Sequence, residues 1–329
     1  MIISKRRSTR GIVLAAAMLA LASVFPFDAS AQAFPNRPLR LIYPYAAGSG
    51  PDILGRMIAV EAAKVLGQPI VYENRPGAQG RLGLQAIKDA PPDGHMLGII
   101  NDGVAISQPA QDPELKLEPG RDYAAVSNLF EAPLVLLGRP DLPFKDMKGF
   151  VAYAKANPAK LNVATATGAS GHFLTERIVR ALGIEVTIIG MKGGAENATA
   201  TLGGHTDLFF STTSMKQNVD SGKLIALASS GRERWKPFAA APTFRETGLQ
   251  VVYATSFPLI AHAGTSRDSI LKLHRAFEAG SRAPEVVKQM DDLAYTSAAA
   301  MSPDDVTALI KSEIAVWIPI LRKAGAKPQ

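Results

Sequence analysis

The chain has 329 residues, no cysteine and a formal net charge of +7. Without cysteine it has no disulfide framework, no lipid-anchoring cysteine and no thiolate site. Its basic residues are spread along the chain without a Lys/Arg block or interleaved aromatics, which argues against nucleic acid as a partner.

The N-terminal segment, residues 1–31, predicts a secretory signal peptide. A basic stretch from Lys5 to Arg10 precedes an apolar run from Gly11 to Phe25, and Ala29-Ser-Ala31 follows as a small-residue cleavage site. The apolar run is roughly 15 residues long, whereas a membrane-spanning helix needs about 20. We therefore expect cleavage after Ala31 and a mature protein in the periplasm.

The first strand–loop–helix unit runs from Leu39 to Leu66. Its first part is an apolar run of strand character, and its last part has apolar residues at helical spacing, closed by Gly67. Pro51 fits the first helical position and Gly50 the cap before it, so the preceding loop lies against free N–H groups. Such an end can bind an anion. The glycines match neither the P-loop nor the dinucleotide motif, which leaves a small carboxylate as the expected ligand.

Beyond this unit, strands alternate with helices, a pattern that predicts an α/β protein whose sheets are mainly parallel and flanked by helices. Strands are expected at Pro69–Glu73, Met96–Ile100, Leu161–Thr165, Glu185–Ile189, Asp207–Ser211 and Leu224–Ala228, with two more in Ala124–Gly138 and one in Gln250–Ala261. Helices are expected near Arg81–Lys88, Asp146–Ala156, Phe173–Leu182, Glu196–Leu202 and from Arg267 onward.

The chain is long enough for two domains, since single cores stop growing near about 300 residues. The segment Pro140-Asp-Leu-Pro143 separates two alternating units, so we expect one sheet in each domain. After the signal peptide, the first domain would cover residues 32–133 and the second residues 134–250. Residues 251–329 would return to the first domain.

The last predicted helix has a recognisable beginning. Ser302-Pro-Asp-Asp305 reads as an N-cap, a proline at the first helical position and acidic residues in the first turn. Trp317, farther along the same helix, is expected to pack in the core, and Pro319 to kink the helix.

A second glycine-rich loop follows the strand predicted at Leu161–Thr165. This loop, Ala166–His172, mixes glycines with the hydroxyls of Thr167 and Ser170, beside that of Thr165. In open α/β sheets, ligands bind outside the carboxyl ends of strands. Two such loops facing each other across a domain cleft are suited to hold one small anion from both sides.

Several motifs, in order from about Pro35 to the C-terminus, resemble the substrate-binding receptors of tripartite tricarboxylate transporters, the Bug receptors. The most specific is Glu73-Asn-Arg-Pro-Gly77, which follows Gly67-Gln-Pro69. The other motifs are Tyr43–Asp52, Pro92-Asp-Gly94, Ala156-Asn-Pro158, Lys160-Leu-Asn162, Lys192-Gly193, Gly222-Lys-Leu224, Ala241-Pro-Thr243 and Gly248.

The resemblance implies a two-domain periplasmic-binding-protein fold of type II-like architecture, with the ligand cleft between the domains. Such a receptor closes on an organic acid and delivers it to membrane permease subunits. The two loops would grip a ligand carboxylate through backbone N–H groups, hydroxyls and water, without a cofactor or a metal. The expected ligand-binding residues are Tyr45, Ala46, Ala47, Gly48, Ser49, Gly50, Asp52, Thr165, Thr167, Gly168, Ala169, Ser170, Gly171, His172, Met191, Lys192, Ser211 and Thr212.

The identity of the ligand stays open at this point: a di- or tricarboxylate, an aromatic carboxylate or an acidic amino acid would each present a carboxylate. Met191 and Ser211 stand where the family often has Tyr and Asp, and both bear on the choice. Asp52 has a structural reason, since a carboxylate in the first helical turn interacts favourably with the helix dipole by about 0.3 to 1 kcal/mol. Its alternative role is to recognise an ammonium group.

Two alternatives come from other functional classes. A secreted hydrolase would use Ser170 with His172 nearby, but the surrounding glycines do not have the spacing of a nucleophile elbow. A ligand-loaded receptor that signals to a membrane sensor would have the same sequence features as a transport receptor. The five histidines form no pair at metal-ligand spacing.

Overall fold

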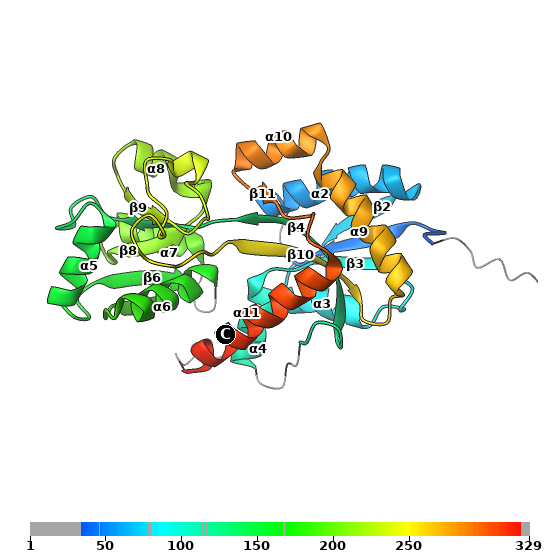
Figure 1. Ribbon diagram of the computed structural model, residues 1–329, viewed down its shortest axis with the longest axis horizontal. Coiled ribbons are helices and arrows are strands. Elements are labelled where there is room, and N and C mark those ends of the chain that lie inside the picture. Colours follow the sequence, from blue (N-terminus) through cyan, green and yellow to red (C-terminus); the bar gives the residue numbers. More distant parts are fainter. Residues whose placement is uncertain are drawn as a thin grey trace, which may run out of the picture.

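The computed structural model describes residues 34–45, 47–77, 80–112, 115, 117–166, 169–191 and 193–323, arranged around two sheets (Figure 1). The first sheet has the strand order β11-β4-β10-β3-β1-β2 and the second the order β7-β6-β8-β5-β9. The strands of the first sheet are β1 (Leu39–Tyr43), β2 (Ile70–Asn74), β3 (Met96–Ile99), β4 (Tyr123–Ala132), β10 (Thr255–His262) and β11 (Thr296–Ser297). Those of the second are β5 (Val135–Gly138), β6 (Asn162–Ala166), β7 (Thr187–Met191), β8 (Leu208–Ser211) and β9 (Ile225–Ser229).

The α/β class is confirmed, but both sheets are mixed where we expected mainly parallel ones. β1 is parallel to β2 and β3, whereas β10 is antiparallel to β3 and β4. β6 is parallel to β7 and β8, whereas β5 is antiparallel to β8 and β9. The reason is the path of the chain, which passes directly from β4 into β5 and later returns into β10. β5 and β10 therefore reach their sheets without a crossover helix, which is the connection that makes neighbouring strands parallel.

Helices cover both faces of the first sheet. The elements are α2 (Gly50–Leu66), α3 (Arg81–Lys88), the π-helix η2 (Gly103–Ser107), α4 (Gln108–Gln111), α9 (Arg267–Ser281), α10 (Pro284–Leu293) and α11 (Pro303–Lys323). α2, α9 and α10 lie on one face, and α3, α4 and α11 on the other (Figure 1). Within the described ranges, every helix is too short or too polar to cross a membrane.

The second sheet is also covered on both faces. Its helical elements are α5 (Met147–Ala156), α6 (Ser170–Leu182), α7 (Gly194–Leu202), the 3-10 helix η3 (Thr213–Met215), α8 (Lys216–Asp220) and the 3-10 helix η4 (Lys236–Phe238). Buried side chains of α5 and α6 share one apolar core with those of α3 and α11. One core therefore continues from the first sheet to the second.

The last part of α11 packs into this shared core and contacts α6. Trp317 on α11 is 1% exposed and stacks on Phe173 of α6, with ring centroids 5.3 Å apart and planes at 20°. The expected core packing of Trp317 is thus confirmed. The predicted N-cap is confirmed too, because the amide of Asp305 donates to Ser302 Oγ over 3.2 Å.

The first glycine loop leads into α2 one residue earlier than expected. Ser49 is the N-cap instead of Gly50, and its hydroxyl accepts a hydrogen bond from the amide of Asp52 over 3.4 Å. Serine is a better cap than glycine because its side chain satisfies one of the free amides. Pro51 lies in the first turn, and Gly67 ends the helix with φ 69°, as the sequence predicts.

Candidate functional site

The two sheets face each other along one edge each. The end of β3 lies beside the middle of β10, and the start of β10 lies beside the end of β4. In the second sheet, the end of β8 lies beside the start of β5, and β6 runs parallel to β8 on its other side. Because only Pro133 and Leu134 separate β4 from β5, these strand ends of the two sheets lie next to each other. Both glycine loops therefore leave strands at the facing edges.

The first glycine loop is held in position by a hydrogen bond from one of its own side chains. Tyr45 donates from its hydroxyl to Asn101 Oδ1 over 2.7 Å, and burial raises the pKa of Tyr45. Gly48 has φ +94° and an open space where a Cβ would lie. Ala47, Gly48 and Ser49 are exposed. The loop thus presents backbone to solvent on its outer side, while Tyr45 anchors it to the segment after β3.

Asp52 is the internal anchor of the same loop. Its carboxylate is 2% exposed and accepts from the Gly48 amide over 2.9 Å, from Asn74 Nδ2 over 2.8 Å and from Arg56 Nε over 3.3 Å. Burial alone would raise the pKa of Asp52, but these hydrogen bonds outweigh it and hold the pKa below its usual value. The geometry supports the structural role of Asp52, whose carboxylate accepts the hydrogen bond of the Gly48 amide within the loop.

The second loop leads into α6. The amides of His172 and Phe173 donate to the carbonyl of Ala169, whereas those of Ser170 and Gly171 donate to no described residue. Adding a Cβ to Gly171 would place it 3.1 Å from Phe210 Cβ, so glycine allows a close approach there. The start of α6 therefore offers two backbone donors for an anion.

The remaining predicted residues of this loop are buried to different degrees. Thr165 is 2% exposed, and its hydroxyl donates to the carbonyl of Ala166 over 3.4 Å. His172 is 4% exposed, and burial lowers its pKa, which favours the neutral imidazole. His172 and Ser170 are two positions apart on a helix and so do not face each other. This arrangement does not form a nucleophile–base pair.

Asp102 joins the two sheets, and the sequence analysis missed it. It follows β3 and is 8% exposed. Its Oδ2 accepts hydrogen bonds from the hydroxyls of Ser170 and Thr255, each over 3.2 Å, and from the hydroxyl of Tyr253. Burial raises the pKa of Asp102 to about 6 despite the bond from Tyr253, and the charge of Glu313 adds to the rise. The signal was available, because Asp102 stands just past the carboxyl end of a predicted strand.

The other predicted residues lie along the edge of the second sheet. Met191 ends β7 and Ser211 ends β8, so they flank β6, and Thr212 follows Ser211. All three side chains are partly buried. The predicted residues Ala46, Thr167, Gly168 and Lys192 lie outside the described residues. Within the described ranges, no group of three or more His, Cys, Asp or Glu side chains is arranged to hold a metal.

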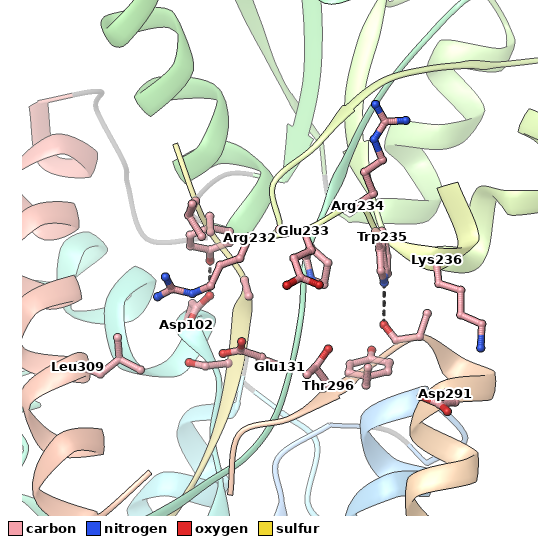
Figure 2. Close-up of a pocket in the computed structure, with 18 of the residues that line it drawn as sticks. Asp102, Glu131, Arg232, Glu233, Arg234, Trp235, Lys236, Asp291, Thr296 and Leu309 are labelled. Carbon is pink, nitrogen blue, oxygen red and sulfur yellow. Dashed lines mark hydrogen bonds between the residues drawn. The ribbon is translucent and has the colours of Figure 1, made fainter. Parts of the chain in front are cut away.

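A cavity of about 590 Å³ lies beside Asp102, between the two sheets (Figure 2). Its walls come from β4, from the segments that follow β9 and precede β10, and from α10, β11 and α11. Tyr295 in this wall lies 3.2 Å from the position that a Cβ on Gly50 would take. The predicted ligand-binding residues do not line this cavity, but Asp102 and Tyr295 connect it to both loops.

Residues 54–326 match the sequence model of a protein family, the tripartite tricarboxylate transporter family receptor. A protein in the gbd 5′ region of Cupriavidus necator is 35% identical over 82% of this chain and 81% of its own length. BugT of Bordetella pertussis is 30% identical over 91% of this chain and 92% of its own. The structure of MatC from Rhodopseudomonas palustris with bound malate is similar with a TM-score of 0.70 and 29% identity, covering 88% of this chain and 100% of MatC.

Proposed function

Because the chain belongs to the receptor family of tripartite tricarboxylate transporters, we propose that it captures a small organic carboxylate between two domains and delivers it to the membrane subunits of such a transporter. The first domain is residues 32–133 together with 251–329, and the second is residues 134–250. Residues 1–31 are a signal peptide, removed after Ala31, which directs the receptor to the periplasm. The protein binds its solute without transforming it.

The observation that carries the proposal is the start of α6 at the facing edge of the second sheet. The amides of Ser170 and Gly171 have no acceptor among the described residues, and they lie at a helix N-terminus. A carboxylate there gains two charge-assisted hydrogen bonds and the favourable helix dipole. Each such hydrogen bond contributes about 1.5 to 3 kcal/mol. The first loop closes on the same solute from the opposite edge.

The solute class follows from chemistry and from one relative. MatC is described with bound malate, a four-carbon dicarboxylate. Small dicarboxylates are therefore the first candidates for this chain. Met191 ends β7, Ser211 ends β8 and Thr212 follows it, so these residues are placed to contact the part of the solute away from the carboxylate held at α6.

A thermal-unfolding screen of the mature chain, starting at Gln32, tests the proposal. The panel contains succinate, malate, aspartate, glutarate, glutamate, citrate and benzoate, each at millimolar concentration. A ligand present at 100 times its dissociation constant stabilises the native state by about 2.7 kcal/mol, which raises the unfolding temperature measurably. At least one acid is expected to do so, with chloride at matched ionic strength as the control. If no acid in the panel stabilises the protein, the proposal is wrong.

A further inference from the structure

The carboxylate of Asp102 lies close to the place proposed for the carboxylate of the solute. Its Oδ2 accepts a hydrogen bond from the hydroxyl of Ser170 over 3.2 Å, and the amide of Ser170 is one of the two donors without a described acceptor at the start of α6. A solute oxygen on that amide would be separated from Asp102 Oδ2 by one serine and two hydrogen bonds, a path of no more than about 9 Å. Two negative charges at this separation repel each other.

The hydrogen-bond partners of Asp102 do not cancel its charge. Oδ2 also accepts from the hydroxyls of Thr255 and Tyr253, and a hydroxyl donor is neutral, like that of Ser170. The side chain is 8% exposed, so water screens its charge little. Burial accordingly raises the pKa of Asp102 to about 6, despite the hydrogen bond from Tyr253. A further negative charge nearby raises this pKa more.

Charged side chains lie near Asp102 on three elements. Glu313 of α11 adds to the rise in the pKa of Asp102. Glu131 of β4 and Arg232 of the segment after β9 line the same cavity, and Figure 2 shows both toward the end at which Asp102 lies. Burial raises the pKa of Glu131, and Arg232 opposes that rise. These two acids and one base leave a negative balance around Asp102, to which a bound carboxylate would add.

The tyrosines and the histidine near the start of α6 are neutral at pH 7. Burial raises the pKa of Tyr253 and that of Tyr45, and the charge of Asp102 acts in the same direction on both. Burial lowers the pKa of His172, in the first turn of α6. Asp102, which contacts Ser170 directly, is therefore the group at this contact that changes its charge near neutral pH.

We propose that Asp102 takes up a proton when the solute carboxylate binds at the start of α6, so that the receptor binds its solute together with a proton. This inference rests on the proposed function, because the bound carboxylate is the charge that repels Asp102. The proton comes from the solvent and converts the carboxylate of Asp102 into a neutral carboxyl group. No other covalent bond forms or breaks.

Because binding and protonation are reciprocally coupled, the protonated form of Asp102 must bind the solute more tightly. A separation of about 9 Å and an effective dielectric constant of about 20 give a difference in affinity of roughly tenfold to thirtyfold. The pKa of Asp102 without solute is about 6. Affinity is therefore expected to be highest below pH 6 and to fall as the pH rises to 8.

Titration calorimetry at pH 7 in two buffers of different ionisation enthalpy, PIPES and imidazole, counts the protons taken up on binding. The probe is the acid that binds most tightly among succinate, malate, aspartate, glutarate, glutamate, citrate and benzoate. Asp102→Asn keeps an oxygen acceptor for Ser170 and removes the charge. Wild type is expected to take up about 0.4 to 0.7 proton per solute more than this variant, a difference that cancels any proton bound by the solute itself.

The affinities themselves give a second readout. At pH 8 Asp102→Asn is expected to bind the same acid about tenfold more tightly than wild type, and at pH 5 about equally. A residue with only a structural role would weaken binding at both pH values when it is replaced. Removing the charge of Asp102 is thus expected to strengthen binding only where that charge is present.

Glu131→Gln is the matched control, because Glu131 is an acid of the same cavity whose pKa is also raised by burial. It is expected to take up as many protons as wild type. Glu313→Gln serves if Asp102→Asn does not fold, since it keeps an acceptor for the indole N–H of Trp317. It is expected to lower the proton uptake at pH 7 and to move the fall in affinity about half a pH unit lower.

The remaining outcomes separate the inference from the function on which it rests. If an acid binds but wild type and Asp102→Asn take up the same number of protons, the carboxylate receptor stands and the coupling to Asp102 is wrong. Uptake that disappears in Glu131→Gln and persists in Asp102→Asn would also overturn the inference, because the proton would be on Glu131. If no acid of the panel binds wild type, both statements are overturned.

Discussion

The hydroxyl of Ser170 lies 3.2 Å from Oδ2 of Asp102, so the first residue of α6 is hydrogen-bonded to the segment that follows β3 of the other sheet. This contact brings the second glycine loop to the first sheet. Tyr45 contacts Asn101, the residue before Asp102, so both loops meet on the same short segment. Changes at this segment are therefore expected to alter both loops together.

The pKa of Asp102 predicts how stability depends on pH. The folded-state pKa of about 6 lies above the ordinary value of 3.8, so the proton-bound form stabilises the fold below pH 4. That contribution is lost as pH rises through about 6. Relative to Asp102→Asn, wild type should lose on the order of 3 kcal/mol of unfolding free energy between pH 4 and pH 7.

Urea unfolding at pH 4, 5, 6 and 7 checks this difference. The titrating groups that act on Asp102 are Tyr253 and Glu313, and both are kept in the variant. Parallel pH profiles for wild type and Asp102→Asn would show that the carboxyl is not perturbed. Asp291→Asn, at an exposed position, is expected to follow wild type.

Asp52 predicts the opposite sign at acid pH. Its folded-state pKa is lowered, so its carboxylate stabilises the fold above its ordinary pKa of 3.8, and that contribution is lost as pH falls through the folded value. Asp52→Asn should cost about 1 to 3 kcal/mol at pH 7, because buried donors lose a charged acceptor. Urea unfolding should show a smaller cost at pH 3. An equal cost at both pH values would contradict the assignment.

Gly48 tests whether the shape of the first loop matters for binding. Its φ of +94° is unfavourable for a β-branched residue, while the space around its Cβ is open, so Gly48→Val acts through backbone strain. Affinity for the identified acid should fall at least tenfold in calorimetry. Gly222→Val is the matched control, because Gly222 has φ +73°, equally open space and a position before β9. Equal affinities in the two variants would show that the first loop does not contribute to holding the solute.

Trp317 is expected to be a main packing contact between α11 and α6. Trp317→Ala removes the stack on Phe173 and should cost about 3 to 5 kcal/mol in urea unfolding. Val316→Ala, next to it but at a side chain that is 53% exposed, should change stability by less than about 0.5 kcal/mol. Similar effects of both changes would mean that the shared core does not depend on this contact.

The sequence was sufficient for elements with strong periodicity. α3 matches its predicted range, and α5 and β8 begin one residue later than expected. The short elements η2, α4, α8 and β11 were not predicted, because two to five residues carry no period. The sheets were expected to be mainly parallel but are mixed, because β5 and β10 run antiparallel to their neighbours, and alternation of strands and helices does not encode that chain path. The N-cap of α2 was predicted at Gly50 instead of Ser49, because glycine is also acceptable at that position.

The candidate site was only partly predictable. The two glycine loops were visible as composition beside strand ends, and both reach the facing edges. Asp102 was missed because its three partners, Ser170, Tyr253 and Thr255, are distant in sequence. Only the fold brings them to one carboxylate. Whether the predicted loop residues contact the solute stays a prediction.

The most direct test of the central claim is a crystal structure of the mature chain with the acid that stabilises it most. We expect a solute carboxylate oxygen about 2.7 to 3.2 Å from the amide nitrogen of Ser170 or Gly171. The solute should lie between the two sheets, with the first loop on its other side. A solute bound elsewhere, without contact to the start of α6, would show that the helix N-terminus does not hold the carboxylate.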